Sequence, residues 1–223
     1  LVKKLVKKID LTSNLFIDVG ANTGMVTKLV LENTNNLNIV CYEPQKATFQ
    51  KLNESLKNEK RCKIFQYAIG SKIEDKILFD WKKYGTGFAS FYGDSIKQFL
   101  LPTYGKVTLD YEDNVKVITL DSINYEKKIA FIKIDVEGNE FEVLKGGRDS
   151  IKNNKPKYIL LEFNKTNVYS RVFMKDLINL LDNYSLYRIM PGGKMLELNN
   201  PYDATTHEIF GSQNIIFINN NKE

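Results

Sequence analysis

The chain has 223 residues, a length that suits one domain with a substantial hydrophobic core. Its composition is globular, with 43% hydrophobic and 26% charged residues, and no apolar run approaches the roughly 18 residues of a membrane span. The net charge is +5, but lysines are scattered among acidic residues and no nucleic-acid-binding motif accompanies them. We therefore expect neither a transmembrane segment nor a nucleic-acid partner.

One histidine and two cysteines, Cys41 and Cys62, nearly exclude a Cys/His metal site. Both cysteines lie at strand-like positions and are predicted to be buried thiols of a reducing compartment. No secretory signal is visible, so a cytoplasmic location is expected. The first residue is Leu rather than Met, which suggests a domain taken from a longer, glycan-modifying polypeptide.

Residues 1–14 are predicted to form a leading helix. Lysines occupy one face of it, and its other face is apolar, with Leu1, Val2, Leu5, Val6 and Ile9. Such a helix could lie on a membrane surface. Because the stretch is short, packing against the following domain is the favoured interpretation.

From Leu15 onward, strand patterns alternate with helical ones. Strands are predicted at 15–19, 37–43, 62–69, 129–136 and 157–163. Helices are predicted at 24–34, 46–58, 139–147 and 168–183. This alternation predicts an α/β fold with a mostly parallel sheet covered on both faces. Three further strands, at 184–190, 194–198 and 213–220, are expected to add an antiparallel pair.

Residues 82–114 interrupt this rhythm with aromatic side chains spread among Gly, Ser, Asp and Pro. We interpret them as an inserted loop or hairpin and a candidate substrate lid within a single domain of residues 1–223. Tyr84 and Phe88 are candidates for stacking on a sugar. The aromatic residues could equally form a small core of their own.

The segment "DVGANTG", Asp18 to Gly24, follows the first strand and precedes a helix. Gly20 allows the backbone to turn, and Gly24 allows the helix to pack closely. The segment lacks the Gly-Lys-Ser/Thr ending of a phosphate-binding loop, and Asn22 replaces the middle glycine of the dinucleotide fingerprint. Asp18 would repel a pyrophosphate and favour a cationic ligand such as S-adenosylmethionine.

Glu43 ends the second strand, where folds of this kind place an acid that binds a ribose. Its carboxylate can accept hydrogen bonds from both ribose hydroxyls. The alternative is a surface acid before a helix. After the third strand, Tyr67, Ala68 and Ile69 are expected at the edge of an adenine.

Five segments together are similar to a known family: "FIDVGANTG", "YEPQKATFQKLNESL", "ITLDSI", "IKIDVEGNEFEVLKGG" and "ILLEFN". They resemble the FkbM family of S-adenosylmethionine-dependent methyltransferases, in order from about Leu15 to Asn164. The resemblance implies a Rossmann-like class I methyltransferase fold, with a mostly parallel seven-stranded sheet and an antiparallel C-terminal strand. It also implies methyl transfer to oxygen, commonly a hydroxyl of a sugar, glycan or natural product.

The resemblance further implies roles for individual residues. The methionine part of the cofactor would be lined by the turn residues Asp18, Gly20, Asn22, Thr23 and Gly24. Glu43 would bind the ribose, and Ala68 would lie near the adenine. Asp135 and Glu137 would lie beside the methyl group, with Glu137 towards the substrate.

A sugar hydroxyl must lose its proton during methyl transfer, so a nearby base is expected. Asp135 ends an apolar strand and is the leading candidate, with Glu162, at the end of the next strand, as the second. One of them could instead only cap a helix or bind amides. His207, the single histidine, is a minor candidate.

A metal is a weaker alternative. Asp135, Glu162 and Asn164 could supply three oxygen ligands to Mg²⁺, but the resemblance does not require one. The acceptor could also be a lipid, a natural product or a protein side chain. Outside catalysis, the fold could serve as a scaffold module, and an NAD-dependent oxidoreductase is disfavoured by Asp18 and Asn22.

Overall fold

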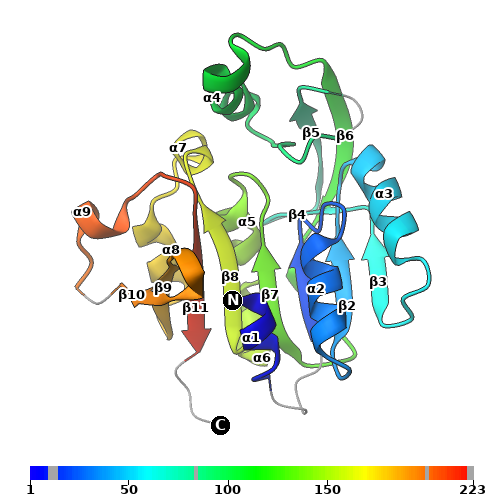
Figure 1. Cartoon of the computed structure of the whole chain (residues 1–223), viewed down its shortest axis with the longest axis vertical. Coiled ribbons are helices and arrows are strands. Elements are labelled where there is room, and N and C mark those ends of the chain that lie inside the picture. Colours follow the sequence, from blue (N-terminus) through cyan, green and yellow to red (C-terminus); the bar gives the residue numbers. More distant parts are fainter. Residues whose placement is uncertain (10–14, 83–84, 199–200, 220–223) are drawn as a thin grey trace.

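The computed structural model describes residues 1–9, 15–82, 85–198 and 201–219. The strands of its main sheet are β1 (Leu15–Val19), β2 (Asn38–Tyr42), β3 (Cys62–Phe65), β7 (Ile129–Ile134), β8 (Tyr158–Phe163), β9 (Tyr184–Ile189), β10 (Met195–Glu197) and β11 (Gln213–Asn219). Among the described residues these eight strands follow the order β10-β9-β11-β8-β7-β1-β2-β3 (Figure 1).

The strand directions confirm the predicted class I methyltransferase arrangement. Strands β3, β2, β1, β7 and β8 are parallel neighbours, and β11 runs antiparallel to both β8 and β9. The sheet is one strand wider than expected, because the short β10 pairs with β9 beyond the predicted edge. The chain leaves β1 towards β2 and β3 and later returns to β7 on the other side. A ligand site is expected at this reversal, at the carboxyl ends of the strands.

Helices cover both faces of the main sheet. They are α1 (Val2–Val6), α2 (Met25–Asn33), α3 (Lys46–Leu56), α5 (Glu140–Lys145), α6 (Arg148–Asn154), α7 (Thr166–Ser170), α8 (Met174–Leu180) and α9 (Ala204–His207). Side chains of a strand alternate between faces. Leu15, Ile17 and Val19 of β1 belong to the core that includes α5, α6 and α8, whereas Phe16 belongs to the core under α1, α2 and α3.

Two elements that were each predicted as one unit are divided in the structure. The helix expected over 168–183 is divided into α7 and α8, because Arg171 adopts a left-handed conformation (φ 57°). A new helix then begins, with the Phe173 N–H donating to the Asp176 carboxylate over 2.8 Å. The strand expected over 62–69 is also divided: β3 stays in the main sheet, and β4 (Ala68–Ile69) pairs in a second sheet. The sequence missed α6 altogether.

The second sheet contains β4, β5 (Glu74–Asp80) and β6 (Tyr111–Ile118), in the order β4-β6-β5. Together with α4 (Gly93–Tyr104) it forms the part at the top of Figure 1, beyond the carboxyl ends of the central strands. The interruption predicted at 82–114 falls here, but its strands begin earlier, at Glu74, and end later, at Ile118. We call residues 74–118 the excursion.

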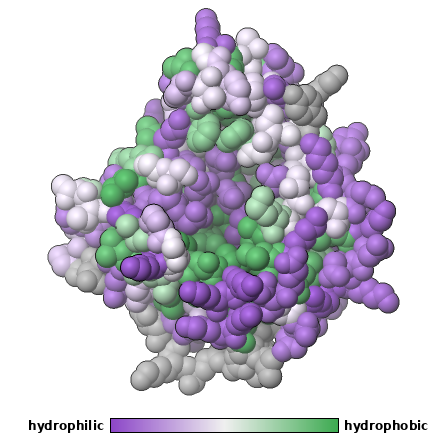
Figure 2. Space-filling view, in the orientation of Figure 1, coloured by the Kyte–Doolittle hydropathy of each residue, from purple (hydrophilic) through white to green (hydrophobic). Residues whose placement is uncertain are grey.

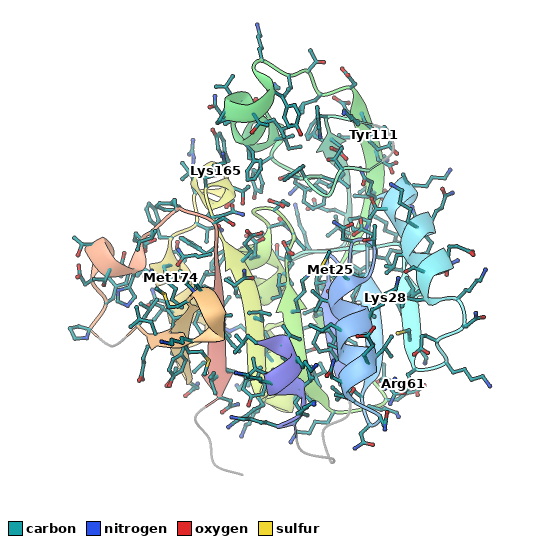
Figure 3. The ribbon with its side chains drawn as sticks, in the orientation of Figure 1. Met25, Lys28, Arg61, Tyr111, Lys165 and Met174 are labelled. Carbon is teal, nitrogen blue, oxygen red and sulfur yellow. The ribbon has the colours of Figure 1, made fainter. Side chains whose placement is uncertain are left out.

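The excursion is attached to the main body on both sides. On one side, the buried carboxylate of Asp80 accepts hydrogen bonds from Gln45 Nε2 at 2.7 Å and from Thr86 Oγ1 at 2.6 Å. On the other, Lys165 lies below α4 (Figure 3), with its Nζ 4.3 Å from the centre of the Phe99 ring. The excursion is therefore held across the carboxyl ends of the main sheet.

The N-terminal helix packs on the domain. Leu5 and Val6 of α1 are buried in the core next to α2, as favoured from the sequence, and residues 10–14 of the predicted helix lie outside the described residues. Figure 2 shows hydrophobic side chains at the centre of this face and hydrophilic ones towards its lower and right-hand edges. No helix among the described residues combines the length and the apolar character needed to cross a bilayer.

Gly146 lets α5 end against the second sheet, and this contact should tolerate no side chain. A Cβ on Gly146 would lie 1.9 Å from the carbonyl oxygen of Gly70. We expect Gly146→Ala to cost about 3 kcal/mol by overpacking and to lower the melting temperature by roughly 6–12 °C. Gly211→Ala is the matched control, because its Cβ would meet nothing closer than 3.8 Å. Equal melting temperatures of the two variants would contradict this packing.

Candidate functional site

A cleft lies at the carboxyl ends of the central strands, beneath the excursion. Its empty space is ≈ 800 Å³, part of it open to solvent. The lining comes from four sources: the ends of β1 and β2, the chain around β4, the loop after β7 with the end of β8, and the excursion. The principal residues are Gly20, Asn22, Glu43, Tyr67, Ala68, Ile69, Asp135, Glu137, Asn139 and Glu162, with Gly87, Ala89 and Phe91 from the excursion.

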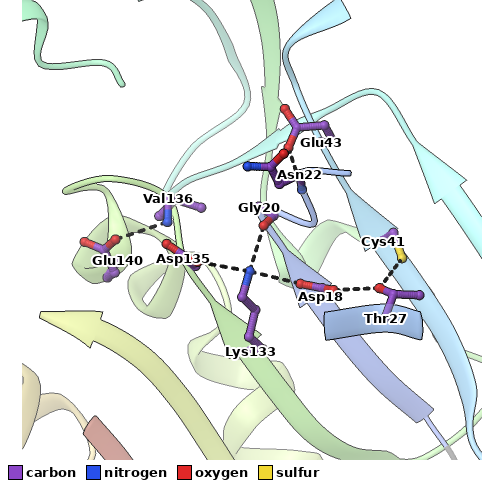
Figure 4. A network of polar contacts seen from close by, with 10 residues as sticks. All are labelled: Asp18, Gly20, Asn22, Thr27, Cys41, Glu43, Lys133, Asp135, Val136 and Glu140. Atoms are coloured by element: carbon purple, nitrogen blue, oxygen red, sulfur yellow. Dashed lines mark hydrogen bonds and ion pairs between the residues drawn. The ribbon is translucent and has the colours of Figure 1, made fainter. Parts of the chain in front are cut away.

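Beneath the cleft, three neighbouring strands contribute one row of polar side chains. Asp18 of β1 is paired in register with Cys41 of β2 and with Lys133 of β7. Lys133 Nζ lies 3.2 Å from Asp18 Oδ1 and donates to the carbonyl of Gly20 over 2.7 Å (Figure 4). Thr27 Oγ1 donates to Asp18 Oδ2 over 2.6 Å and contacts Cys41 Sγ.

This row corrects the role expected for Asp18. Its side chain is fully buried and is not among the residues that line the cleft. Lys133 compensates its charge, so Asp18 does not itself present a negative charge to a ligand. The thiol of Cys41 is buried and free as expected, whereas that of Cys62 is free but only half-buried.

The glycine turn has the conformation that its sequence requires. Gly20 has φ 72°, and a Cβ there would lie 1.9 Å from the Asp135 carbonyl oxygen, so only glycine fits. Gly24 (φ 87°) packs against Leu52 of α3, which agrees with its expected role in helix packing. Asn22 lines the cleft, but neither Thr23 nor Gly24 is among the lining residues.

Glu43 stands at the end of β2, in the wall of the cleft, as the sequence predicted. It is only 7% exposed, and its two oxygens accept hydrogen bonds from the N–H groups of Asn22 (2.9 Å) and Gln45 (3.0 Å). Burial raises the pKa of Glu43 to about 7, against the lowering effect of these two hydrogen bonds. The geometry leaves a fixed carboxylate facing the cleft.

Three carboxylates meet on the opposite side of the cleft. One oxygen each of Asp135, Glu137 and Glu162 lie within 4.8 Å of one another. Asp135 Oδ2 is 3.4 Å from Lys133 Nζ, and Glu162 Oε1 accepts a hydrogen bond from Ser212 over 2.6 Å. Burial, followed by repulsion from Glu162 and Asp135, raises the pKa of Glu137 to about 9. Burial also raises the pKa of Glu162.

The loop that carries Glu137 is held from below by Glu140, which the sequence analysis did not single out. Glu140 Oε1 accepts hydrogen bonds from the N–H groups of Val136 and Gly138, both at 3.2 Å. Glu137 itself has a positive φ of 51°, and its carbonyl accepts a hydrogen bond from Ser90 of the excursion at 2.7 Å. These bonds hold a strained residue in place, a feature that recurs at functional sites.

The predicted metal ligand set is only partly brought together. Asn164 Oδ1 already accepts hydrogen bonds from Thr166 N (2.7 Å) and Thr166 Oγ1 (2.6 Å), so this oxygen is engaged. Glu137 takes its place beside Asp135 and Glu162.

Two other predicted residues, His207 and Phe88, are not among the residues that line the cleft. His207 is buried in α9, where its Nδ1 lies 2.8 Å from the carbonyl of Asp203. The Phe88 ring packs against Phe99, with 4.8 Å between the ring centres, while its neighbours Gly87 and Ala89 line the cleft. Tyr84 lies outside the described residues.

Sequence reasoning also missed Lys133. The signal was present, because "IAFIKID" places one lysine in a strand that is otherwise apolar and was expected to be buried on both faces. Among fully buried strand residues a charge requires a partner, and Asp18 at the same level of β1 is that partner.

Comparisons with known proteins agree with this arrangement. Residues 18–189 match the Methyltransferase FkbM domain. The chain is 24% identical over 199 residues to the 2-O-methyltransferase NoeI of Sinorhizobium fredii (strain NBRC 101917 / NGR234), covering 86% of this chain and 80% of that protein.

Solved structures show the same fold. A methyltransferase FkbM from Methylobacillus flagellatus KT superposes with a TM-score of 0.56 at 16% identity, over 92% of this chain. An uncharacterized protein from Listeria monocytogenes serotype 4b gives 0.50 at 10% identity, covering 99% of this chain and 67% of its own. The chain spans less than half, 44%, of the length of the Methylobacillus protein.

Stability should depend on pH through Glu137. Its pKa of about 9 in the folded protein exceeds the 4.5 of an ordinary glutamate, so its protonated form favours folding below pH 4.5 and this contribution is lost as pH rises towards 9. The pKa values of Glu43 and Glu140 are both raised to about 7, so their ionisation also lowers stability, at lower pH than that of Glu137. We expect the melting temperature to fall between pH 7 and 9 in the wild type and to stay level in Glu137→Gln. Between these two pH values the wild type should lose about 2 kcal/mol of stability that the variant keeps.

The control for this measurement is Glu197→Gln, at an exposed position of β10. It should follow the wild-type curve. A Glu137→Gln variant that also follows that curve would show that Glu137 is not held in its neutral form by the folded protein.

Proposed function

The chain belongs to the FkbM methyltransferase family, and we propose that it transfers a methyl group from S-adenosylmethionine to a hydroxyl oxygen of a sugar or glycan. The observation that carries the proposal is the cleft itself. Glu43 lies on one wall of it, and three carboxylates, Asp135, Glu137 and Glu162, meet on the other. Methyl donor and acceptor can therefore meet between a ribose-binding acid and a group that takes up a proton.

The residues present fit the cofactor. The bare backbone at Gly20 leaves room beside the turn, and the Glu43 carboxylate is fixed for two ribose hydroxyls. Asn139 donates to the Ile69 carbonyl over 3.1 Å, and its buried Oδ1 has no hydrogen-bonding partner among the described residues. An exocyclic amino group of adenine would supply one. When bound, S-adenosylmethionine supplies a methyl group on a sulfonium.

We assign the proton acceptor to Glu162 rather than to Asp135, the leading candidate from the sequence. One oxygen of Asp135 faces the Lys133 ammonium at 3.4 Å, whereas Glu162 accepts a hydrogen bond from the neutral hydroxyl of Ser212. Glu162 takes the proton of the acceptor hydroxyl, which must be held roughly 3 Å from the methyl carbon. Glu137, neutral at pH 7, can donate a hydrogen bond to an acceptor oxygen.

A sugar acceptor is supported by three observations. NoeI is named as a 2-O-methyltransferase. Among the described residues, those that line the cleft include four carboxylates and neither lysine, arginine nor histidine, a set that suits a polyol better than an anion. The excursion adds the aromatic side chain of Phe91 to the lining of the cleft. Lipid, natural-product and protein acceptors are the other outcomes of an acceptor screen.

Cofactor binding is the first test. Isothermal titration should give micromolar affinity for S-adenosylmethionine and S-adenosylhomocysteine in the wild type. Glu43→Ala should weaken both by about a hundredfold, since it removes two charge-assisted hydrogen bonds to the ribose. Glu197→Ala serves as the surface control. If the wild type binds neither compound, the activity is absent and the fold serves as a non-catalytic module.

The base is tested by Glu162→Gln. We expect kcat to fall by about 10²–10⁴ while the affinity for S-adenosylmethionine is retained. Asp135→Asn should instead weaken cofactor binding. If Asp135→Asn abolishes turnover with binding intact, the base is Asp135. Repeating the assay with EDTA tests Mg²⁺, and undiminished transfer is the expected result.

A further inference from the structure

Lys133 is a buried cation placed directly under the reaction site. Its side chain is 8% exposed, and it belongs to the strand whose end carries Asp135. Its Nζ has three proton-accepting neighbours: Gly20 O at 2.7 Å, Asp18 Oδ1 at 3.2 Å and Asp135 Oδ2 at 3.4 Å (Figure 4). The ammonium thus donates one hydrogen bond to a backbone carbonyl and pairs with two carboxylates.

The lysine remains charged despite its burial. Burial alone would lower the pKa of Lys133, but the nearby carboxylates of Asp18 and Asp135 outweigh this effect and raise it. A fixed positive charge therefore stands on the under side of both the glycine turn and Asp135.

Pairing with Asp18 alone does not explain this arrangement. Replacing a buried ion pair with apolar residues of similar size is often neutral or stabilising, so the pair is weak evidence for a purely structural role. Two of the three contacts, moreover, lead to the cleft: Gly20 and Asp135 both line it. The lysine is thus better explained by what it does for these two groups.

We propose that Lys133 is a positioning residue for methyl transfer: from beneath the cleft it fixes the Gly20 turn and orients the Asp135 carboxylate towards the cation of the methyl donor. The inference rests on the proposed function, and it adds a residue that acts through Asp135 without touching the ligand. Lys133 holds one oxygen of Asp135, and Asp135 lines the cleft.

Other charged groups lie around Asp135. Asp18 lies on β1, Glu43 follows β2, Glu137 and Glu140 are in the loop and helix after β7, and Glu162 is on β8. All of these are acidic. Lys133 is the cation that contacts Asp135, so its removal takes away the contact that holds this carboxylate from below.

The test uses the double variant Asp18→Asn/Lys133→Met. It removes one charge of each sign, so the net charge is unchanged, and it leaves no unpaired buried ion. The single variant Lys133→Met would leave Asp18 uncompensated and is expected to unfold. Isothermal titration with S-adenosylmethionine at pH 7.5 is the readout. The double variant should bind at least tenfold more weakly than the wild type, because the Asp135 carboxylate has lost the contact that orients it.

The matched control is Lys157→Met, which also removes a lysine that donates to a backbone carbonyl, that of Asn219 at 3.0 Å, away from the cleft. It should keep the wild-type affinity. In an Asp135→Asn background, the double substitution should cause no further loss of affinity, because the two effects act through the same carboxylate.

A folded double variant with the wild-type affinity would overturn the inference. If the double variant does not fold, Asp135→Asn alone decides: at pH 7.5 it should bind S-adenosylmethionine at least tenfold more weakly, and wild-type affinity would overturn the inference. A wild type that binds no S-adenosylmethionine at any pH refutes instead the proposed function.

Discussion

The arrangement of the site depends on one buried ion pair. Asp18 and Lys133 stand at the same level of two adjacent parallel strands, where neither can reach water. Each charge in such a place requires the other, because an unpaired buried ion costs several kcal/mol. The two residues are paired in the register of β1 with β7, and Gly20 and Asp135 follow them at the carboxyl edge, where Lys133 contacts both.

Two further acids at this edge, Glu43 and Glu140, accept hydrogen bonds from backbone N–H groups. Glu43 accepts from the turn after β1, and Glu140 accepts from the loop after β7. Each ties the chain that leaves one strand to a neighbouring segment. The excursion then closes over them through Asp80 and the bond from Ser90 to the Glu137 carbonyl. The walls of the cleft are therefore cross-linked by hydrogen bonds from three separate parts of the chain.

The sequence predicted what depends on local pattern. Apolar runs and capping glycines located β1, β2, β7 and β8, and the position of Glu43 after a strand end placed it in the cleft. The sequence placed Asp18 beside the ligand, whereas its side chain is buried against Lys133. Only the pairing of β1 with β7 determines which partner a strand residue meets. The break at Arg171 and the pairing of β4 outside the main sheet likewise depend on tertiary contacts.

The three carboxylates near the end of β7 differ in their surroundings, and the separate roles that we propose for them rest on this difference. Three like charges so close together oppose full ionisation. Asp135 has an ammonium beside it and Glu162 has a hydroxyl, whereas burial and its acidic neighbours raise the pKa of Glu137 to about 9. In our proposal, Glu162 accepts a proton and Glu137 donates a hydrogen bond within one small space. A sugar hydroxyl, which both donates and accepts, suits both groups.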